Sequence, residues 1–335
     1  SDWMRGKKAL LIVLMVLLTV LLLLKGMQGE KRQQIADFEE KVVIAHRGAC
    51  GYLPEHTLES YAVAFALGAN YIEPDLVMTK DGVLICLHDM HLERTTDVEE
   101  VFPDRHRSDD RWYATDFTLD EIKMLKAHER CDSDGNPCFP DRFPSNFSEF
   151  EIPTFAEMIE LIRGLNKSTG RSVGIYPELK HPSWHAKEGL PMENALLDTL
   201  NKYGYRGPDA KVYIQCFDPE SLKKLRFKFR TELPLLQLIG AEGDRVLDEN
   251  ELDEVATYAN GIGPDKELVE REPELVSMAH ERGLLVHSWT FRADELPERY
   301  SDFEEELFQF YFVYGVDGVF TDFPDRAVSL LAKKE

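Results

Sequence analysis

Basic side chains are scarce in this sequence, where 39 Lys and Arg stand against 61 Asp and Glu and give a net charge of -22. Nucleic-acid binding needs clustered Lys and Arg, so this composition argues against nucleic acid as a partner. Apolar residues are not lacking, since they make up 43% of the 335 residues. The chain can therefore bury the core of one large barrel domain or of two ordinary domains. The excess of carboxylates favours a divalent cation as a ligand wherever several of them converge.

Cysteine is also rare, with five residues in the chain. Cys131 and Cys138 lie in a polar loop, and two interpretations stay open for them. A disulfide closing a small loop would suit an oxidising compartment, and the alternative is a pair of free thiols. Cys86 and Cys216 lie inside apolar runs and are expected in the core. Cys50 lies in a glycine-rich loop, where no histidine is placed to activate it as a nucleophile.

Only one apolar run approaches the width of a membrane. It extends from Ala9 to Leu24, follows a basic segment at residues 5–8 and ends at Lys25. As a helix it would span roughly 24 Å of a hydrocarbon core about 30 Å thick. The run is either a cleaved signal peptide or an uncleaved signal anchor. The residues after it match a cleavage site poorly, and no cysteine follows to carry a lipid, so we favour the anchor.

These features divide the chain into three parts. Residues 1–29 form the signal anchor or signal peptide, residues 30–40 a charged stalk, and residues 41–335 the folded domain. The basic flank of the apolar run places its N-terminal side in the cytoplasm. The domain is then membrane-anchored and extracytoplasmic (periplasmic, extracellular or lumenal), or it is secreted if the segment is cleaved.

Short β-branched runs alternate with amphipathic stretches in the rest of the chain, which predicts a parallel sheet covered by helices. The predicted strands are 42–46, 71–78, 83–88, 172–179, 212–217, 234–239, 260–263, 284–289 and 317–320. Because only four residues separate 71–78 from 83–88, these two must form an antiparallel hairpin. Eight parallel strands remain, and they predict an α/β fold of the (β/α)₈ TIM-barrel type. Helical patterns fill most of the gaps, for example at 57–68 and 154–165.

No strand–helix alternation is visible between about residues 94 and 150. We expect an insertion here that caps the mouth of the barrel. Its one predicted helix lies near 118–127, where Thr118 and Glu121 have the spacing of a capping box.

Charged side chains lie on the first two predicted strands or directly after them, in the part of the fold where barrel enzymes hold their sites. His46 can transfer protons near neutral pH, and Arg47 can bind a phosphate through two parallel hydrogen bonds. Glu73 and Asp75 point to the same face of one strand. Such carboxylates repel each other unless one is protonated or a cation such as Ca²⁺ or Mg²⁺ lies between them. The alternative is a pair at an edge that faces solvent.

The hairpin fixes the place of a second histidine. If Thr79 pairs with Val83, His88 lies across from residues 73–74, with the register uncertain by one residue. His88 would then return to the two carboxylates, and the alternative is a core histidine.

The next parallel strand adds a third carboxylate, because Glu178 and Lys180 share one of its faces. Three carboxylates without the glycines of a phosphate-binding loop suit a metal held directly by protein oxygens.

Short motifs follow one another in a fixed order along residues 42–326. They are His46-Arg47-Gly48, Pro54-Glu55-His56-Thr57, Glu73-x-Asp75, Lys80-Asp81-Gly82, His88-Asp89, Glu178-x-Lys180 and Thr321-Asp322-x-Pro324. This series resembles the glycerophosphodiester phosphodiesterase family, and within it the periplasmic bacterial branch most closely. The resemblance implies a TIM barrel with a small domain inserted after the second histidine. It also implies hydrolysis of glycerophosphodiesters to glycerol 3-phosphate and an alcohol.

The resemblance further implies a role for individual residues and a divalent metal, with Ca²⁺ expected and Mg²⁺ as the alternative. The implied roles are general acid and base for His46 and His88, substrate contacts for Arg47, Lys180 and Trp289, and metal ligands for Glu73, Asp75 and Glu178.

Two other functions are weighed beside this one. A lysophospholipase D acting on membrane lysolipids would expose apolar side chains on the insertion, at Phe139, Phe143, Phe147 and Phe150, which could instead form the insertion's own core. A catalytically silent binding module is the second alternative, and the intact set of histidines, carboxylates and arginine speaks against it.

Overall fold

The computed structural model describes residues 41–243 and 246–333 of the chain. The predicted anchor at 1–29 and stalk at 30–40 lie outside the described residues. The described residues belong to one compact unit. Within the described part, no helix is both long enough and apolar enough to cross a bilayer.

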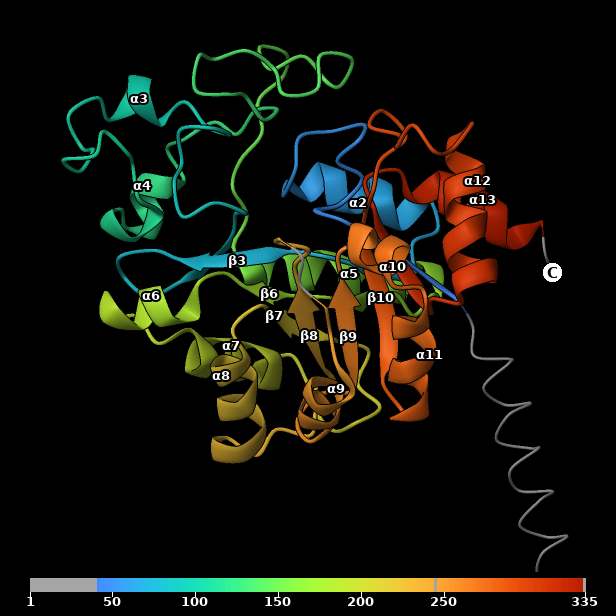
Figure 1. The fold of residues 1–335 in the computed structure, drawn as a ribbon. Coiled ribbons are helices and arrows are strands. Elements are labelled where there is room, and N and C mark those ends of the chain that lie inside the picture. The colour runs from blue at the N-terminus through green and yellow to red at the C-terminus, as the bar shows by residue number, and fades with distance from the viewer. Residues whose placement is uncertain (1–40, 244–245, 334–335) are drawn as a thin grey trace, which may run out of the picture. The chain divides into compact units, whose positions relative to one another are not determined.

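The strands of the described residues form one curled sheet of eleven strands. They are β1 (Val42–Ala45), β2 (Tyr71–Ile72), β3 (Asp75–Met78), β4 (Leu84–Cys86), β5 (Gly174–Ile175), β6 (Glu178–Leu179), β7 (Ile214–Cys216), β8 (Leu235–Ile239), β9 (Gly261–Pro264), β10 (Leu285–Phe291) and β11 (Gly318–Thr321). Every predicted strand is present. Figure 1 shows the sheet surrounded by helices.

Two of the predicted strands are each divided by a proline. Pro74 separates β2 from β3, and Pro177 separates β5 from β6. Proline has no N–H to donate to a ladder, so regular pairing stops there and resumes beyond it. Parallel pairings join β11 to β1, β1 to β2, β2 to β5 and β3 to β6, and they continue strand by strand from β6 to β11. If β2 with β3 and β5 with β6 are each counted as one strand, and the antiparallel β4 is left aside, these pairings join eight parallel strands. The fold is therefore an α/β barrel, as predicted.

The antiparallel hairpin also has the predicted register. β3 pairs with β4 so that Val77 lies opposite Ile85, and the N–H of Thr79 donates to the carbonyl of Val83 at 2.9 Å. One residue beyond β4, the N–H of Leu87 donates to the carbonyl of Asp75 at 3.0 Å. The hairpin therefore returns the chain to the carboxylate-bearing end of β3.

Helices and short helical turns fill the connections between the strands. They are α2 (Leu58–Ala66), α3 (Val98–Val101), η1 (Ala114–Asp116), α4 (Leu119–Ile122), α5 (Phe155–Thr169), α6 (Pro182–Lys187), α7 (Met192–Lys202), α8 (Pro219–Lys223), η2 (Lys224–Lys228), α9 (Glu249–Ala256), α10 (Lys266–Arg271), α11 (Glu274–Glu281), α12 (Phe303–Phe308), η3 (Gln309–Tyr314) and α13 (Pro324–Ala332). The predicted helices at 57–68 and 154–165 correspond to α2 and α5. Thr154 and Glu157 close a capping box at the start of α5, whose apolar face, including Phe155 and Ile159, is buried in the main core.

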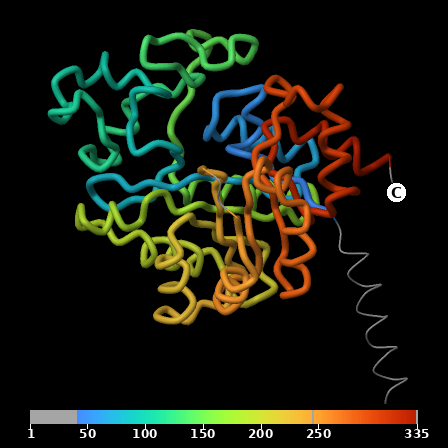
Figure 2. The backbone as a smooth tube through the Cα atoms, viewed as in Figure 1, coloured from blue at the N-terminus to red at the C-terminus, as the bar shows by residue number. Residues whose placement is uncertain are grey.

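The insertion after β4 consists mostly of loops, which gather on one side of the barrel (Figures 1 and 2). Thr118 and Glu121 form the predicted capping box, but α4 ends at Ile122 rather than near residue 127. Beyond the end of α4, Ala127 pairs with Phe150 in a β-bridge instead of continuing the helical pattern. The core of the insertion is continuous with the barrel, since Val77 of β3 packs in the same cluster as the apolar side chains of the insertion. All five cysteines carry free thiols, including Cys131 and Cys138.

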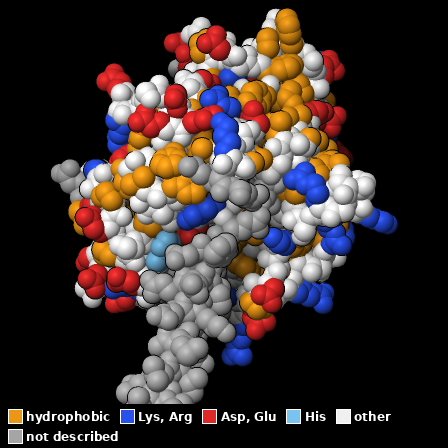
Figure 3. Space-filling model, turned by 90° about the vertical axis from the view of Figure 1, so that its right-hand side faces the viewer, with side chains coloured by type: hydrophobic (Ala, Val, Ile, Leu, Met, Phe, Trp, Pro, Cys, Tyr) orange, Lys and Arg blue, Asp and Glu red, His pale blue; other side chains and the backbone are white. Residues whose placement is uncertain are grey.

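Charged side chains of both signs are interspersed with apolar ones on the face shown in Figure 3. Many surface charges are paired, as where Arg282 contacts Asp253 at 2.6 Å and Glu249 at 3.0 Å. Such exposed pairs contribute little to stability.

Candidate active site

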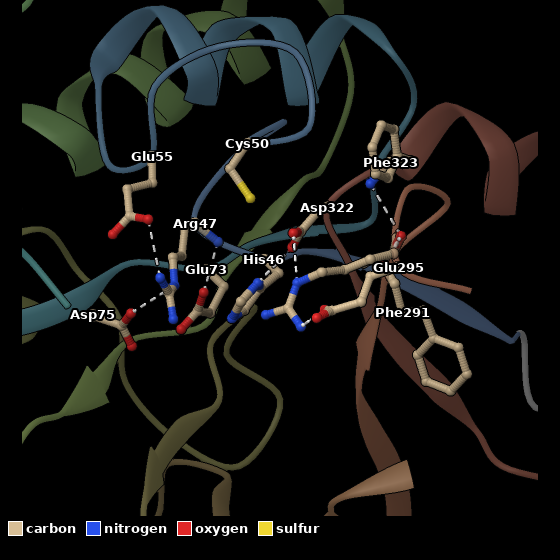
Figure 4. Close-up of polar contacts among 12 residues, drawn as sticks. His46, Arg47, Cys50, Glu55, Glu73, Asp75, Phe291, Glu295, Asp322 and Phe323 are labelled. Atoms are coloured by element: carbon tan, nitrogen blue, oxygen red, sulfur yellow. Dashed lines mark hydrogen bonds and ion pairs between the residues drawn. The ribbon is translucent and has the colours of Figure 1, made fainter. Parts of the chain in front are cut away.

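His46 lies directly after β1, where its backbone N–H donates to the carbonyl of Thr321 in the neighbouring strand β11 at 3.0 Å. Its Nδ1 is 2.7 Å from Oδ1 of Asp322 (Figure 4). The carboxylate fixes the ring and leaves Nε2 available for proton transfer. Burial and the charge of Arg47 lower the pKa of His46 to about 4 although Asp322 raises it, so the imidazole is neutral at neutral pH.

Arg47 lies between two carboxylates, as Figure 4 shows. Its Nη1 donates to Glu55 at 3.0 Å and its Nε lies 3.5 Å from Asp75. The backbone of Arg47 has a φ of 56°, and its N–H donates to Glu73 at 2.7 Å. Gly48 follows with a φ of 89°, and an added Cβ there would lie 2.4 Å from a side-chain oxygen of α2. A glycine is therefore required for the sharp turn that presents the arginine.

Three buried carboxylates converge beside this arginine. Glu73, Asp75 and Glu178 each offer one oxygen, and these oxygens lie within 4.8 Å of one another. The pairing of β3 with β6 places Asp75 directly beside Glu178. Burial and the charge of Asp75 raise the pKa of Glu73 well above its usual range, and burial raises the pKa of Glu178 to about 8. Burial also disfavours the charged form of Asp75, but Lys180 and His56 hold the pKa of Asp75 well below its usual range.

The chemistry of this donor set fits a hard divalent cation. Oδ1 of Asp75 is buried and has no hydrogen-bond partner among the described residues. Carboxylate oxygens that repel one another are the ligands that Ca²⁺ and Mg²⁺ prefer, and the oxygen without a donor is free to bind such an ion. A second group of potential ligands, His46, Cys50 and Asp322, fits poorly. Arg142 and Arg292 already bind Asp322, and burial raises the pKa of the Cys50 thiol.

The second histidine reaches the same place from the hairpin. Nδ1 of His88 lies 2.6 Å from Oδ1 of Asp89. Burial and the charge of Arg47 lower the pKa of His88 to about 3, so this ring is also neutral at neutral pH. The two histidines therefore share one design, a neutral imidazole whose Nδ1 is held by a carboxylate.

All the predicted site residues line one cavity of about 140 Å³. Its lining consists of His46, Arg47, Glu73, Asp75, His88, Glu178, Lys180, Gln215, Phe217, Leu238, Trp289, Thr290, Arg292 and Phe320. Nζ of Lys180 is 2.9 Å from Glu178, which leaves the ammonium group beside the carboxylates. The indole N–H of Trp289 donates to the carbonyl of Gly263 at 2.7 Å, and its ring packs edge-on against Phe217. These contacts fix the indole at the wall of the cavity.

Several side chains that support the site were not identified from the sequence as parts of it. Asp322, Asp89, Glu55 and His56 occur in the motifs of the family resemblance, but no role was assigned to them. Nε2–H of His56 donates to Oδ2 of Asp75 at 2.9 Å, because the ionised carboxylate can only accept. Gln215 donates to Glu73 at 3.1 Å. It lies inside a predicted strand, and no feature of the sequence distinguishes it from an ordinary strand residue.

A larger groove of about 850 Å³ adjoins the cavity. The two share Glu178, Lys180, Phe217 and Leu238 as lining residues. Phe217 is 43% exposed between them. A ligand bound in the cavity therefore has room to extend into the groove.

The fold and the site define a barrel enzyme suited to an anionic phosphate ester, because cationic side chains, neutral histidines and buried carboxylates meet at one cavity. The sequence model of the Glycerophosphoryl diester phosphodiesterase family matches residues 46–326. A glycerophosphodiester phosphodiesterase of Haemophilus influenzae is 41% identical over 87% of this chain and 90% of its own length. The chain therefore belongs to this family, and its activity is that of a glycerophosphodiester phosphodiesterase. The family predicted from the motifs is confirmed.

Solved structures agree with this assignment. The crystal structure of a putative glycerophosphoryl diester phosphodiesterase from Silicibacter pomeroyi has a TM-score of 0.70 and 26% identity, covering 89% of this chain and 95% of the other. An Oleispira antarctica phosphodiesterase, solved in complex with the product sn-glycerol-3-phosphate, has a TM-score of 0.63 and 22% identity and covers 89% and 99%. At that identity the second likeness shows the fold alone.

Proposed function

We propose that this enzyme depends on a divalent metal ion, Ca²⁺ or alternatively Mg²⁺, and that it hydrolyses glycerophosphodiesters to glycerol 3-phosphate and an alcohol. The observation that carries the metal is the convergence of three buried carboxylates, one of which, Asp75, has an unpartnered Oδ1. Glu73, Asp75 and Glu178 would hold the ion. The glycerol 3-phosphate bound to the Oleispira antarctica relative supports the assignment of the product.

The cationic residues would bind and orient the phosphodiester. A bound divalent ion would supply positive charge next to the phosphate and so reduce the repulsion of an approaching nucleophile. Arg47 is held by Glu55 on one side and Asp75 on the other, and it would present its remaining donors to the phosphate oxygens. Lys180 would offset the negative charge of a second phosphate oxygen. The indole of Trp289, whose orientation is fixed, would pack against the glycerol.

The two histidines would exchange protons with the reacting oxygens. One takes a proton from the attacking oxygen at its unprotonated Nε2. The other would first gain a proton from solvent at Nε2, as an imidazolium favoured by its carboxylate and by the bound phosphodiester anion, and would donate that proton to the leaving alkoxide. Both rings keep Nε2 for this purpose, because Nδ1 of His46 is bound by Asp322 and Nδ1 of His88 by Asp89. The attacker is water or the neighbouring hydroxyl of the glycerol. We favour the hydroxyl, which would form a cyclic phosphate before water opens it.

The insertion gives no support to a lysolipid substrate. Phe150 is buried in the core of the insertion, Phe143 packs edge-on against it, and Phe139 stacks beneath the guanidinium of Arg142. Only Phe147 among these four aromatic residues is largely exposed, at 59%. We therefore place the leaving alcohol of a soluble glycerophosphodiester in the adjoining groove. For residues 1–29 we propose an anchor that keeps the domain at the outer face of a membrane.

Side-by-side turnover of glycerophosphocholine and lysophosphatidylcholine tests the proposal. Each substrate is assayed after exhaustive chelation and after Ca²⁺ or Mg²⁺ is returned. We expect glycerol 3-phosphate from glycerophosphocholine, loss of activity on chelation and recovery with the metal. Full activity after chelation would refute the metal, and faster release from lysophosphatidylcholine would favour the lysophospholipase D.

A further inference from the structure

We propose that the insertion takes part in catalysis through two positioning residues, Arg130 and Arg142, which hold the carboxylates that bind the catalytic histidines. The inference rests on the proposed roles of His46 and His88. The insertion would then do more than cover the mouth of the barrel, because each arginine extends from one of its irregular loops towards the site.

Arg130 connects two groups of the site. Its Nη1 donates to Oδ2 of Asp89 at 2.7 Å, and the other oxygen of Asp89 binds His88 at 2.6 Å. Its Nε and Nη2 grip Glu55 at 3.0 and 2.7 Å. Glu55 in turn accepts from Arg47 at 3.0 Å. One guanidinium therefore holds both the partner of a histidine and the partner of the phosphate-binding arginine, and its side chain is only 10% exposed.

Arg142 makes the equivalent connection to the other histidine. Its Nη2 donates to Oδ2 of Asp322 at 2.8 Å, while Oδ1 of Asp322 binds His46 at 2.7 Å. The side chain is 5% exposed. Two bonds to Asp294, at 2.8 and 3.0 Å, and the ring of Phe139 beneath the guanidinium fix its orientation. Each catalytic histidine is thus the end of an arginine–carboxylate–imidazole series that begins in the insertion.

The contacts indicate which of the two arginines has the larger effect on its histidine. Arg292 also binds Asp322, at 2.9 Å, so loss of Arg142 leaves that carboxylate with one cation. Within the described residues, Arg130 is the one cation paired with Asp89, whose other partner is the neutral ring of His88. Removal of Arg130 should therefore loosen its histidine more than removal of Arg142. Because Glu55 would be released as well, Arg130 should also affect the binding of the phosphate.

The arginines are replaced in the full chain, and turnover of glycerophosphocholine is measured with saturating metal. Arg130→Ala should lower kcat on the order of 10²-fold and also raise KM. Arg142→Ala should lower kcat by roughly tenfold with KM nearly unchanged. Arg130→Lys should not restore the rate, because one ammonium group cannot bridge Glu55 and Asp89 as the planar guanidinium does.

Arg105→Ala is the matched control, since this insertion arginine binds Glu121 at 2.9 Å within the insertion and reaches no site residue. It should leave kcat and KM unchanged.

Two readouts separate positioning from a purely structural tie between insertion and barrel. Added guanidinium should restore part of the activity of Arg130→Ala, whereas the same concentration of sodium should not. In the His46→Ala background, Arg142→Ala should cause no further loss, because the residue acts through that histidine.

Unchanged kcat in folded Arg130→Ala, absence of rescue, or a fully multiplicative loss in the double variant would each overturn the inference. If Arg130→Ala does not fold, the cycle between Arg142 and His46 decides the matter alone. A wild-type enzyme inactive towards glycerophosphodiesters would refute the proposed function instead.

Discussion

Replacing Glu73 by Gln should abolish activity and at the same time stabilise the metal-free protein. Glu73 is buried next to Asp75 and Glu178, and burial together with the charge of Asp75 raises its pKa. A raised pKa means that folding disfavours the charged form of this carboxyl group. Gln keeps the shape of the side chain but carries no charge, so it removes the repulsion together with the metal ligand.

The magnitude can be estimated in two ways. Two unit charges 4.8 Å apart, the upper limit of the oxygen separations here, repel by ~3.5 kcal/mol at an effective dielectric constant of about 20. Protonating at pH 7 a carboxyl group whose ordinary pKa is 4.5 costs about 3.4 kcal/mol. If the repulsion between the carboxylates exceeded this cost, Glu73 would take up a proton, so the metal-free protein can retain no more repulsion than that. The amide of Gln215 must turn or lose its bond to residue 73, at a cost of roughly 1 kcal/mol. The net gain is about 2 kcal/mol, or a rise in Tm of roughly 3 °C.

Thermal unfolding and turnover of the wild-type and Glu73→Gln proteins test this reasoning together. After chelation the variant should melt at the higher temperature. Addition of Ca²⁺ should raise the Tm of the wild type much more than that of the variant, and only the wild type should recover turnover of glycerophosphocholine. A chelated variant that is less stable than the chelated wild type would refute the electrostatic account. A variant with full activity would refute the metal site.

Three further predictions concern the histidines, pH and the N-terminal segment. His46→Ala and His88→Ala should each reduce kcat on the order of 10²–10⁴-fold, and the double variant should lose much less than the product of the two, whereas multiplicative losses would indicate separate steps. The pKa of Glu178 rises from 4.5 to about 8 on folding, so between these two pH values the metal-free folded protein binds more protons than the unfolded chain. Its free energy of unfolding should therefore fall between pH 6.5 and 8, by up to about 2 kcal/mol, in denaturant titrations, and Glu178→Gln should remove the slope. Deletion of residues 1–29 should leave turnover of glycerophosphocholine unchanged, and N-terminal sequencing of the natural protein should find this segment retained; a mature chain beginning near residue 27–31 would show a cleaved signal peptide.

The barrel could be predicted because its determinants are local. Strand and helix patterns alternate along the chain, and the four-residue turn between β3 and β4 allows only an antiparallel pairing. The register of that hairpin follows from the turn, which is why the position of His88 could be derived. The bridge between Ala127 and Phe150 could not be derived, because it joins two residues far apart in the sequence, and it lies where the pattern predicted the end of a helix.

In the candidate site too, residues placed by a local pattern could be predicted, and residues placed by contacts between distant segments could not. Alternation along a strand predicts that Glu73 and Asp75 share a face, and both line the cavity. The groups that orient the histidines depend on contacts between distant segments. Arg130 is 41 positions from Asp89, and Arg142 is 180 positions from Asp322. Both arginines lie in a region without regular periodicity, where a sequence pattern cannot indicate which side chains point towards the barrel.

The charge of the cavity wall is consistent with the proposed chemistry. Its lining holds three carboxylates and three cationic side chains, and both of its histidines are neutral at neutral pH, so the charges of the wall cancel once all three carboxylates are ionised to hold a metal. With a divalent ion held by the carboxylates the wall would carry two positive charges. A phosphodiester brings one negative charge, and a second develops as the attacking oxygen adds to phosphorus. The loaded cavity would therefore match the charge of the transition state better than that of the substrate, and this difference is what lowers a reaction barrier.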